Sequence, residues 1–159
     1  MKPVEELVQL CSEQGFTIAS CESLTAGLFS ATVACVPGAS RVLKGGFVTY
    51  WTEIKEKLVH VEHSIVEEYG VVSSPCAKSM AEHTQQLMDV DFAVSFTGNA
   101  GPSTMEGKPA GCVYCAIATR ANTYPFHFQC DRMDRNEVRT YVVEQMIENL
   151  LAQVKKECE

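Results

Sequence analysis

The hydrophobic positions of this chain alternate between the period of a helix and the short runs of a buried strand. Apolar residues recur every three or four positions in several segments, which predicts helices with one buried face. Short apolar runs rich in β-branched and aromatic residues predict strands between them. The expected helices begin near Val4, Leu24, Thr52, Ser74 and Asp134, and the expected strands cover residues 16–21, 47–51, 92–96, 112–118 and 125–130.

The order of these elements predicts one layered α/β/α domain over residues 1–159. Helices alternate with strands in the first half and strands cluster later, which favours a mixed, mostly parallel sheet flanked by helices. The strands 112–118 and 125–130 are expected to be antiparallel neighbours. No internal repeat or linker divides the chain.

Composition and charge restrict the classes of function. A formal net charge of -7 without a basic run disfavours nucleic-acid binding, which needs a positive surface for phosphates. No apolar stretch is long enough to span a membrane, and the start of the chain lacks a signal-peptide core. We therefore expect no nucleic-acid partner, no membrane association and a cytoplasmic location.

The eight cysteines raise the question of a metal site. Cys112 and Cys115 are spaced like half of a zinc site, but the chain has no second such pair. On a strand, positions i and i+3 face opposite sides of the sheet. We therefore expect the cysteines to be small buried apolar residues, and we expect neither a metal nor an organic cofactor.

Ser23 lies where the first predicted strand gives way to a helical pattern. Backbone N–H groups at the start of a helix are unpaired and favour negative charge. A serine there could attack a carbonyl carbon while these N–H groups hold the oxyanion. Alternatively, Ser23 or Thr25 is only the N-cap of the helix.

Two cations stand in helical first turns, where the helix dipole disfavours them. Lys55 occupies the place where a capping box opened by Thr52 would have Glu, and burial there would lower the pKa of its amine towards that of a general base. The alternative is an exposed lysine. Arg135 poses the same question, and a bound phosphate or an ion pair with Asp131 would each answer it.

The segment 97–102 follows a predicted strand and is either a cradle for a polar substrate or only a turn. Known nucleotide motifs do not fit the chain. Residues 101–108 imitate a P-loop, but the spacing is one residue too long and Pro109 stands where a Ser or Thr should bind magnesium.

Taken together, these segments resemble the C-terminal domain of the competence/damage-inducible CinA family. The resemblance covers nearly the whole chain in order, and the combination is specific although each piece alone is weak. It rests on ESLTAG at 22–27, PGAS at 37–40, GGFVTY at 45–50 with Lys55, GVVS at 70–73, TGNAGP at 97–102, KPAG at 108–111 and DRNEVR at 134–139.

The resemblance implies a stand-alone amidohydrolase that converts nicotinamide mononucleotide (NMN) to nicotinate mononucleotide and ammonia, in NAD recycling. The family's serine nucleophile falls on Ser23, its catalytic lysine on Lys55 and its tyrosine on Tyr50. The substrate-binding positions that we expect are Thr25, Gly27, Thr97, Gly98, Asn99, Ala100, Gly101, Arg135 and Arg139. Homologous domains suggest a homo-oligomer, a dimer or larger.

Three departures from the family pattern put substrate preference and rate in question. Residues 103–105 replace a double glycine, Cys112 replaces a threonine, and Asn99 stands where many members have a small apolar residue. The alternative functions are a non-catalytic nucleotide-sensing or protein-interaction module linked to competence and DNA damage, and an amidohydrolase for a different amide.

Overall fold

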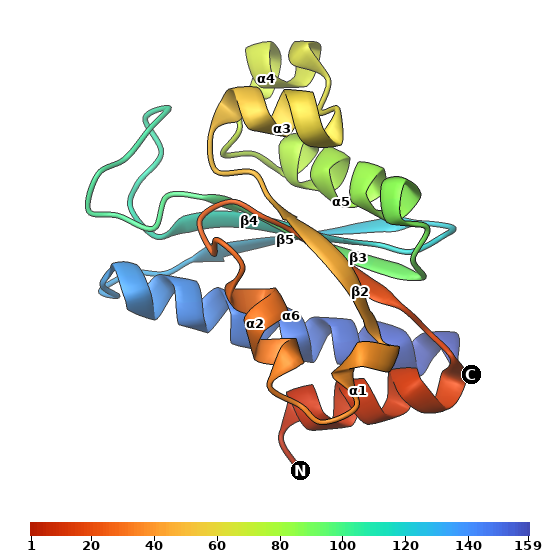
Figure 1. The fold of residues 1–159 in the computed structure, drawn as a ribbon. Helices are drawn as coiled ribbons and strands as arrows, with labels where there is room; N and C mark the ends of the chain where they lie inside the picture. Colours follow the sequence, from red (N-terminus) through yellow and green to blue (C-terminus); the bar gives the residue numbers. More distant parts are fainter.

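A five-stranded sheet runs through the middle of the molecule, with helices on both faces (Figure 1). The computed structural model describes residues 1–159. The helices are α1 (Pro3–Gln14), α2 (Leu28–Ala34), the short 3₁₀ helix η1 (Ala39–Arg41), α3 (Thr52–Val59), α4 (His63–Tyr69), α5 (Ser74–Met88) and α6 (Arg135–Glu157), and the strands are β1 (Ile18–Glu22), β2 (Leu43–Val48), β3 (Phe92–Gly98), β4 (Cys112–Ala118) and β5 (Thr123–Gln129).

The strand order is β2-β1-β3-β4-β5. Strand β1 pairs in parallel with β2 and β3, whereas β4 pairs antiparallel with β3 and β5. Four strands therefore run in one direction and β4 alone is reversed. The predicted layered α/β fold with a mixed, mostly parallel sheet is confirmed, as is the antiparallel pairing of the last two strands.

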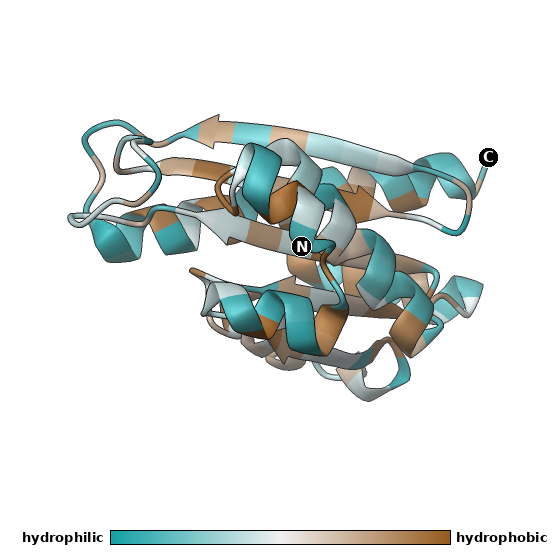
Figure 2. Cartoon of the chain, turned by 90° about the horizontal axis from the view of Figure 1, so that it is seen from above, coloured by the Kyte–Doolittle hydropathy of each residue, from teal (hydrophilic) through white to brown (hydrophobic).

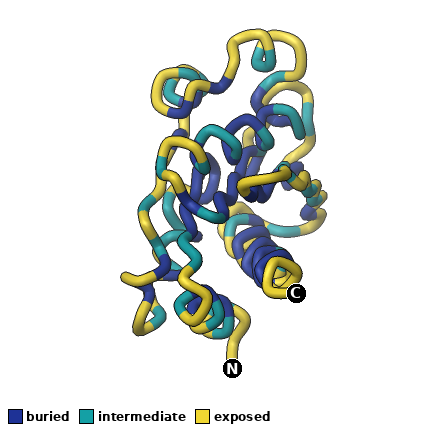
Figure 3. Tube along the Cα trace, turned by 90° about the vertical axis from the view of Figure 1, so that its right-hand side faces the viewer, coloured by how far each residue is buried: buried dark blue, intermediate teal, exposed yellow.

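The two faces of the sheet carry separate hydrophobic cores. Helices α1, α2 and α6 cover one face and enclose the larger cluster, while α3, α4 and α5 cover the other (Figure 1). Hydrophobic residues concentrate along the strands and the inner faces of the helices, and the buried positions lie between the layers (Figures 2 and 3). The opening helix and the helix that begins near Asp134 are as predicted. Helix α1 ends at Gly15, and Asp134 and Glu137 form a capping box at the start of α6.

Cys112 and Cys115 lie in different core clusters, on opposite faces of the sheet, as strand geometry predicts. All eight cysteines are free, and six of them are buried. No group of three or more His, Cys, Asp or Glu side chains is arranged to hold a metal ion. None of the helices is both long enough and apolar enough to cross a membrane.

The helix after Ser23 begins later than predicted. Residues 23–27 form a run of turns, here called the 23–27 turn, and α2 starts at Leu28 instead of Leu24. Ala26 and Gly27 have φ angles of 48° and 98°, which interrupt a right-handed helix. The buried side chains of α2 are Phe29 and Val33.

The segment that precedes Lys55 also differs from the prediction. Strand β2 ends at Val48, so residues 49–51 are a connection and not the end of a strand. The N-cap of α3 is Trp51, and Thr52 is the first residue inside the helix. Lys55 still falls in the first turn of α3, where the prediction placed it.

Glu22, at the end of β1, fixes the start of α2. Its buried carboxyl group accepts hydrogen bonds from the backbone N–H groups of Phe29 (2.8 Å) and Ser30 (3.1 Å), which α2 itself leaves unpaired. The hydroxyls of Ser20 (2.9 Å) and Ser30 (3.1 Å) also donate to it. The side chain beside Ser23 thus anchors the end of the 23–27 turn.

Replacing Glu22 with Ala should destabilise the protein, because two buried N–H groups would lose their acceptor. We expect the free energy of unfolding to fall by about 1–3 kcal/mol, measured by urea denaturation. Glu13→Ala, at an exposed position, is the control and should change it by less than about 0.5 kcal/mol. Equal urea midpoints for Glu22→Ala and the wild type would show that the cap contributes nothing.

Candidate functional site

The candidate site lies at the carboxyl ends of the parallel strands. Strands β1 and β3 run side by side in register from Ile18 and Phe92, so Ser23 emerges next to the end of β3. The N–H of Ser23 donates to Phe96 O (3.0 Å), which ties the residue to that strand. Open α/β sheets characteristically bind ligands at this edge.

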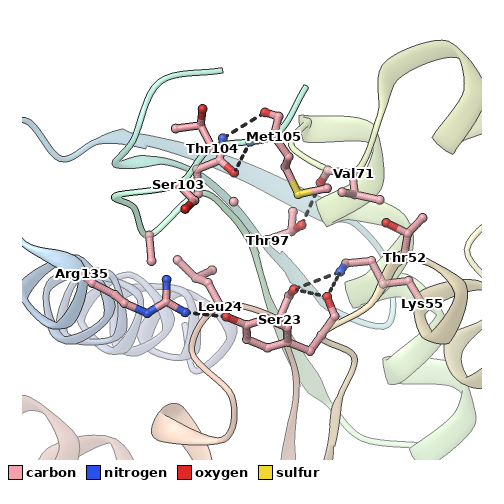
Figure 4. A pocket seen from close by; sticks show the side chains of 14 residues that line it. Ser23, Leu24, Thr52, Lys55, Val71, Thr97, Ser103, Thr104, Met105 and Arg135 are labelled. Carbon is pink, nitrogen blue, oxygen red and sulfur yellow. Dashed lines mark hydrogen bonds between the residues drawn. The ribbon is translucent and has the colours of Figure 1, made fainter. Parts of the chain in front are cut away.

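A pocket of about 250 Å³ opens at this edge (Figure 4). It is bordered by the 23–27 turn, the start of α3, the end of β3 and the start of α6. The loop between β3 and β4, here called the 99–111 loop, closes its remaining side. The lining residues are Ser23, Leu24, Tyr50, Thr52, Lys55, Val71, Thr97, Gly98, Asn99, Ala100, Ser103, Thr104, Met105 and Arg135.

Ser23 and Lys55, 32 positions apart in the chain, meet in this pocket. The Lys55 Nζ atom lies 2.9 Å from Ser23 Oγ (Figure 4). It also donates to the backbone carbonyls of Thr49 (2.8 Å) and Tyr50 (3.2 Å). Ser23 Oγ lies 3.4 Å from the same Tyr50 carbonyl. The two carbonyls before α3 therefore hold the amine against the hydroxyl.

Lys55 is buried without a carboxylate partner. Only 2% of its surface is exposed, and no Asp or Glu oxygen forms an ion pair with it. Loss of hydration lowers the pKa of the amine from its ordinary value of 10.5, opposed by weaker electrostatic effects of Cys76, Cys21 and Glu106. The interpretation of Lys55 as an exposed lysine is therefore wrong.

Tyr50 and Arg135 meet at the mouth of the pocket. The Arg135 guanidinium donates through Nη1 to Gly101 O (2.8 Å) and through Nη2 to the Tyr50 hydroxyl (2.6 Å). It makes no ion pair with Asp131 or any other carboxylate, so that interpretation of Arg135 is wrong. A cation without a counter-ion thus borders the pocket.

Four expected substrate-binding residues do not line the pocket: Gly101, and three residues in or behind the 23–27 turn, which are Arg139, Thr25 and Gly27. Arg139 donates through Nε to Leu24 O (2.8 Å) and through Nη2 to Thr25 O (3.1 Å), so it binds the backbone of the 23–27 turn from outside the pocket. Thr25 is fully buried, and its hydroxyl has no hydrogen-bond partner. Gly27 supplies the left-handed residue before α2. All three shape the turn that carries Ser23.

The other expected residues belong to the end of β3 and the 99–111 loop. Thr97, Gly98, Asn99 and Ala100 line the pocket, and Gly101 reaches it only through the contact of its carbonyl with Arg135. The Thr97 hydroxyl donates to Val71 O (2.7 Å). The Asn99 amide donates to the carbonyls of Met105 (3.2 Å) and Lys108 (3.1 Å), which folds the loop onto itself.

Sequence reasoning did not identify Glu106, which fastens this loop over the pocket. Its carboxylate accepts from the N–H groups of Val71 and Val72, both at 2.8 Å, and Lys108 Nζ donates to Val72 O (2.8 Å). The placement of Ser103, Thr104 and Met105 in the lining follows from this anchor. In the sequence, the available signal that this loop matters was the departure of residues 103–105 from the family pattern.

The free N–H groups next to Ser23 belong to a turn and not, as predicted, to the start of a helix. Glu22 occupies the N–H groups of Phe29 and Ser30 at the start of α2. The N–H groups of Leu24 and Thr25, directly after Ser23, make no hydrogen bond within the protein. A hydroxyl beside a buried amine and two free N–H groups is an arrangement suited to acyl transfer.

Relatives with known sequences support the family assignment. The chain is 44% identical to a competence-damage inducible protein of Listeria welshimeri over 142 residues, covering 89% of this chain and 34% of that protein. It is 38% identical to one from Limosilactobacillus reuteri, covering 94% of this chain and 37% of that protein. The chain thus spans about a third of the length of these relatives.

Solved structures share the fold. A competence/damage inducible protein, CihA, from Agrobacterium tumefaciens superposes with a TM-score of 0.87 at 30% identity, covering 96% of each chain. A CinA superfamily protein from Klebsiella pneumoniae gives a TM-score of 0.93 at 22% identity, over 97% of this chain and 96% of that one. The family model of the CinA C-terminal domain matches residues 1–154, so the chain belongs to the CinA C-terminal domain family.

Proposed function

We propose that this chain is an amidohydrolase that converts NMN to nicotinate mononucleotide and ammonia, with Ser23 as nucleophile and Lys55 as general base. The observation that carries the proposal is the buried Lys55 amine, 2.9 Å from Ser23 Oγ in a pocket at the strand ends. Family membership is consistent with it, although the names of the relatives mention competence and damage and not an amide substrate.

The surroundings of Lys55 favour the neutral amine that a base requires. A neutral amine has two N–H bonds and one lone pair. In the structure Nζ donates to the Thr49 and Tyr50 carbonyls and to Ser23 Oγ. In the neutral form the two carbonyls accept both N–H bonds, and the lone pair takes the third position, facing Ser23 Oγ. Burial disfavours the ammonium form, so the free amine is available closer to neutral pH than in an exposed lysine.

In the proposed reaction, Ser23 Oγ attacks the carboxamide carbon of NMN while its proton moves to Lys55. The N–H groups of Leu24 and Thr25 hold the oxyanion. The C–N bond then breaks, and ammonia leaves with the proton from Lys55. Water attacks the resulting ester and loses a proton to Lys55. The bond between Ser23 Oγ and the acyl carbon then breaks, Lys55 returns the proton to Ser23 Oγ, and the acid product leaves and ionises to the carboxylate. Tyr50 contributes its carbonyl to this pair and its hydroxyl to Arg135.

The mouth of the pocket suits the phosphate end of the substrate. Arg135 has no counter-ion there, and a guanidinium binds phosphate through paired N–H groups. The N–H groups of Ala100, Gly101, Ser103 and Thr104 make no hydrogen bond within the protein and offer further donors on the loop side. The carboxamide would then lie at Ser23 and the phosphate near Arg135.

Ser23→Ala and Lys55→Met should each lower ammonia release from NMN by at least about a thousandfold, because each removes half of the reacting pair. A coupled ammonia assay measures this, and thermal melts check that both variants fold. Lys57→Met, on an exposed position of the same helix, should keep wild-type activity. Full turnover by either site variant would overturn the mechanism. A folded wild type without turnover would favour the non-catalytic alternative.

Lys55→Met should also raise the free energy of unfolding at pH 7. The folded protein binds the Lys55 proton more weakly than the unfolded chain does, so this lysine costs stability at neutral pH. Each tenfold loss of proton affinity corresponds to about 1.4 kcal/mol. The cost should vanish as the pH rises towards 10.5, where the unfolded amine also loses its proton. Urea denaturation of both proteins at pH 7 and pH 10 tests this, and a constant difference would contradict it.

Arg135→Ala should raise KM for NMN about tenfold or more and change kcat by less than about threefold, because a phosphate contact serves the ground state and the transition state alike. Steady-state kinetics measure both constants. The nucleoside that lacks the phosphate is the matched control substrate, and its kcat/KM should be the same for wild type and variant. An equal loss with both substrates would show that Arg135 does not bind the phosphate.

A further inference from the structure

Arg139 lies behind the 23–27 turn and does not line the pocket, yet two of its guanidinium nitrogens donate to backbone carbonyls directly after Ser23. Its Nε donates to Leu24 O (2.8 Å) and its Nη2 to Thr25 O (3.1 Å), across 115 and 114 positions of sequence. Its Nη1 donates to Asn136 Oδ1 (3.1 Å). No carboxylate forms an ion pair with it.

The contact with Leu24 O sets the direction of the Thr25 N–H. A peptide group is planar, and in the trans form its C=O and N–H point in opposite directions. The peptide that joins Leu24 and Thr25 is trans, because the chain has a cis peptide only at Gly101-Pro102. Since Arg139 holds the carbonyl of this peptide, its N–H, which belongs to Thr25, points away from α6.

Arg139 also fixes the direction of the Leu24 N–H, but indirectly, through one further hydrogen bond. The peptide partner of the Leu24 N–H, Ser23 O, accepts from the N–H of Ala26 (3.0 Å). The Ala26 N–H belongs to the peptide group whose carbonyl is Thr25 O. Arg139 also binds that carbonyl. Both free N–H groups after the serine therefore have their directions fixed by carbonyls on the Arg139 side.

We propose that Arg139 is a positioning residue for the oxyanion site: it acts through the Leu24 and Thr25 peptides and touches no substrate. This inference rests on the proposed role of Ser23 as nucleophile. The uncompensated charge also polarises the two peptide carbonyls, which makes the attached N–H groups better donors. The planar fork of Arg139 reaches two carbonyls at once, which a lysine cannot do in the same geometry.

The test uses a probe that needs an oxyanion site but not NMN. Diisopropyl fluorophosphate reacts with a nucleophilic serine: a bond forms between Ser23 Oγ and phosphorus, the P–F bond breaks, fluoride leaves, and the serine proton passes to Lys55. The phosphoryl oxygen occupies the oxyanion position during this step. Intact-protein mass spectrometry follows the labelling rate, and Ser23→Ala identifies the labelled residue.

Arg139→Gln should lower both the labelling rate and kcat for NMN by about tenfold to a hundredfold. An oxyanion donor stabilises only the transition state, so a misdirected donor slows the reaction without weakening substrate binding. KM and the affinity for nicotinate mononucleotide should stay within about threefold, which a general collapse of the pocket would not allow. Arg139→Lys, which keeps the charge and one contact, should recover part of the rate. Arg41→Gln, at an exposed position away from the site, should match the wild type.

Three results would overturn the inference. The first is wild-type labelling by both Arg139 variants, and the second is a loss of product binding as large as the loss of rate. The third is a wild type in which Ser23 takes no label. A wild type that is labelled at Ser23 but releases no ammonia from NMN would refute the proposed function and leave the role of Arg139 standing.

Discussion

The site depends on one buried amine that has no carboxylate beside it. An ammonium group enclosed by apolar side chains and thiols is costly, and the Lys55 environment offers it two backbone carbonyls and a hydroxyl in place of a counter-ion. The carbonyls of Thr49 and Tyr50 accept hydrogen bonds but are not counter-ions, and burial disfavours the ammonium form and lowers the pKa of Lys55. Burial of Lys55 lowers the stability of the folded protein, as is common for groups at functional sites.

The 23–27 turn is held from two sides by ionisable residues outside the pocket. Glu22 accepts the N–H groups at the start of α2, and Arg139 donates to the carbonyls of Leu24 and Thr25. Glu22 thus fixes the start of α2, and Arg139 fixes two carbonyls of the turn. The N–H groups of Leu24 and Thr25, which follow Ser23, make no hydrogen bond within the protein and remain free for a ligand.

The sequence predicted the layers of the fold and the region of the site, but not the details of the turn. Hydrophobic periodicity located the long helices, because α1, α5 and α6 each bury one continuous face. It misplaced the start of α2, since the side chain that caps this helix belongs to the preceding strand. The pairing of Lys55 with Ser23 could be anticipated only from the family resemblance, and the Thr49 carbonyl carries no sequence signal at all. Arg139 was assigned to substrate from the family resemblance, whereas the direction of its side chain from α6 depends on tertiary packing.

The charge state of Lys55 is the most direct point at which to test this account. Two-dimensional NMR of protein labelled with ¹³C at the lysine ε-carbons can follow each amine through a pH titration, and Lys55→Met identifies the resonance of interest. We predict that the pKa of Lys55 lies below its ordinary value of 10.5, because the amine is buried without a counter-ion. A Lys55 resonance whose pKa is not lowered would contradict this, because Ser23 would then have an ammonium group and not a base beside it.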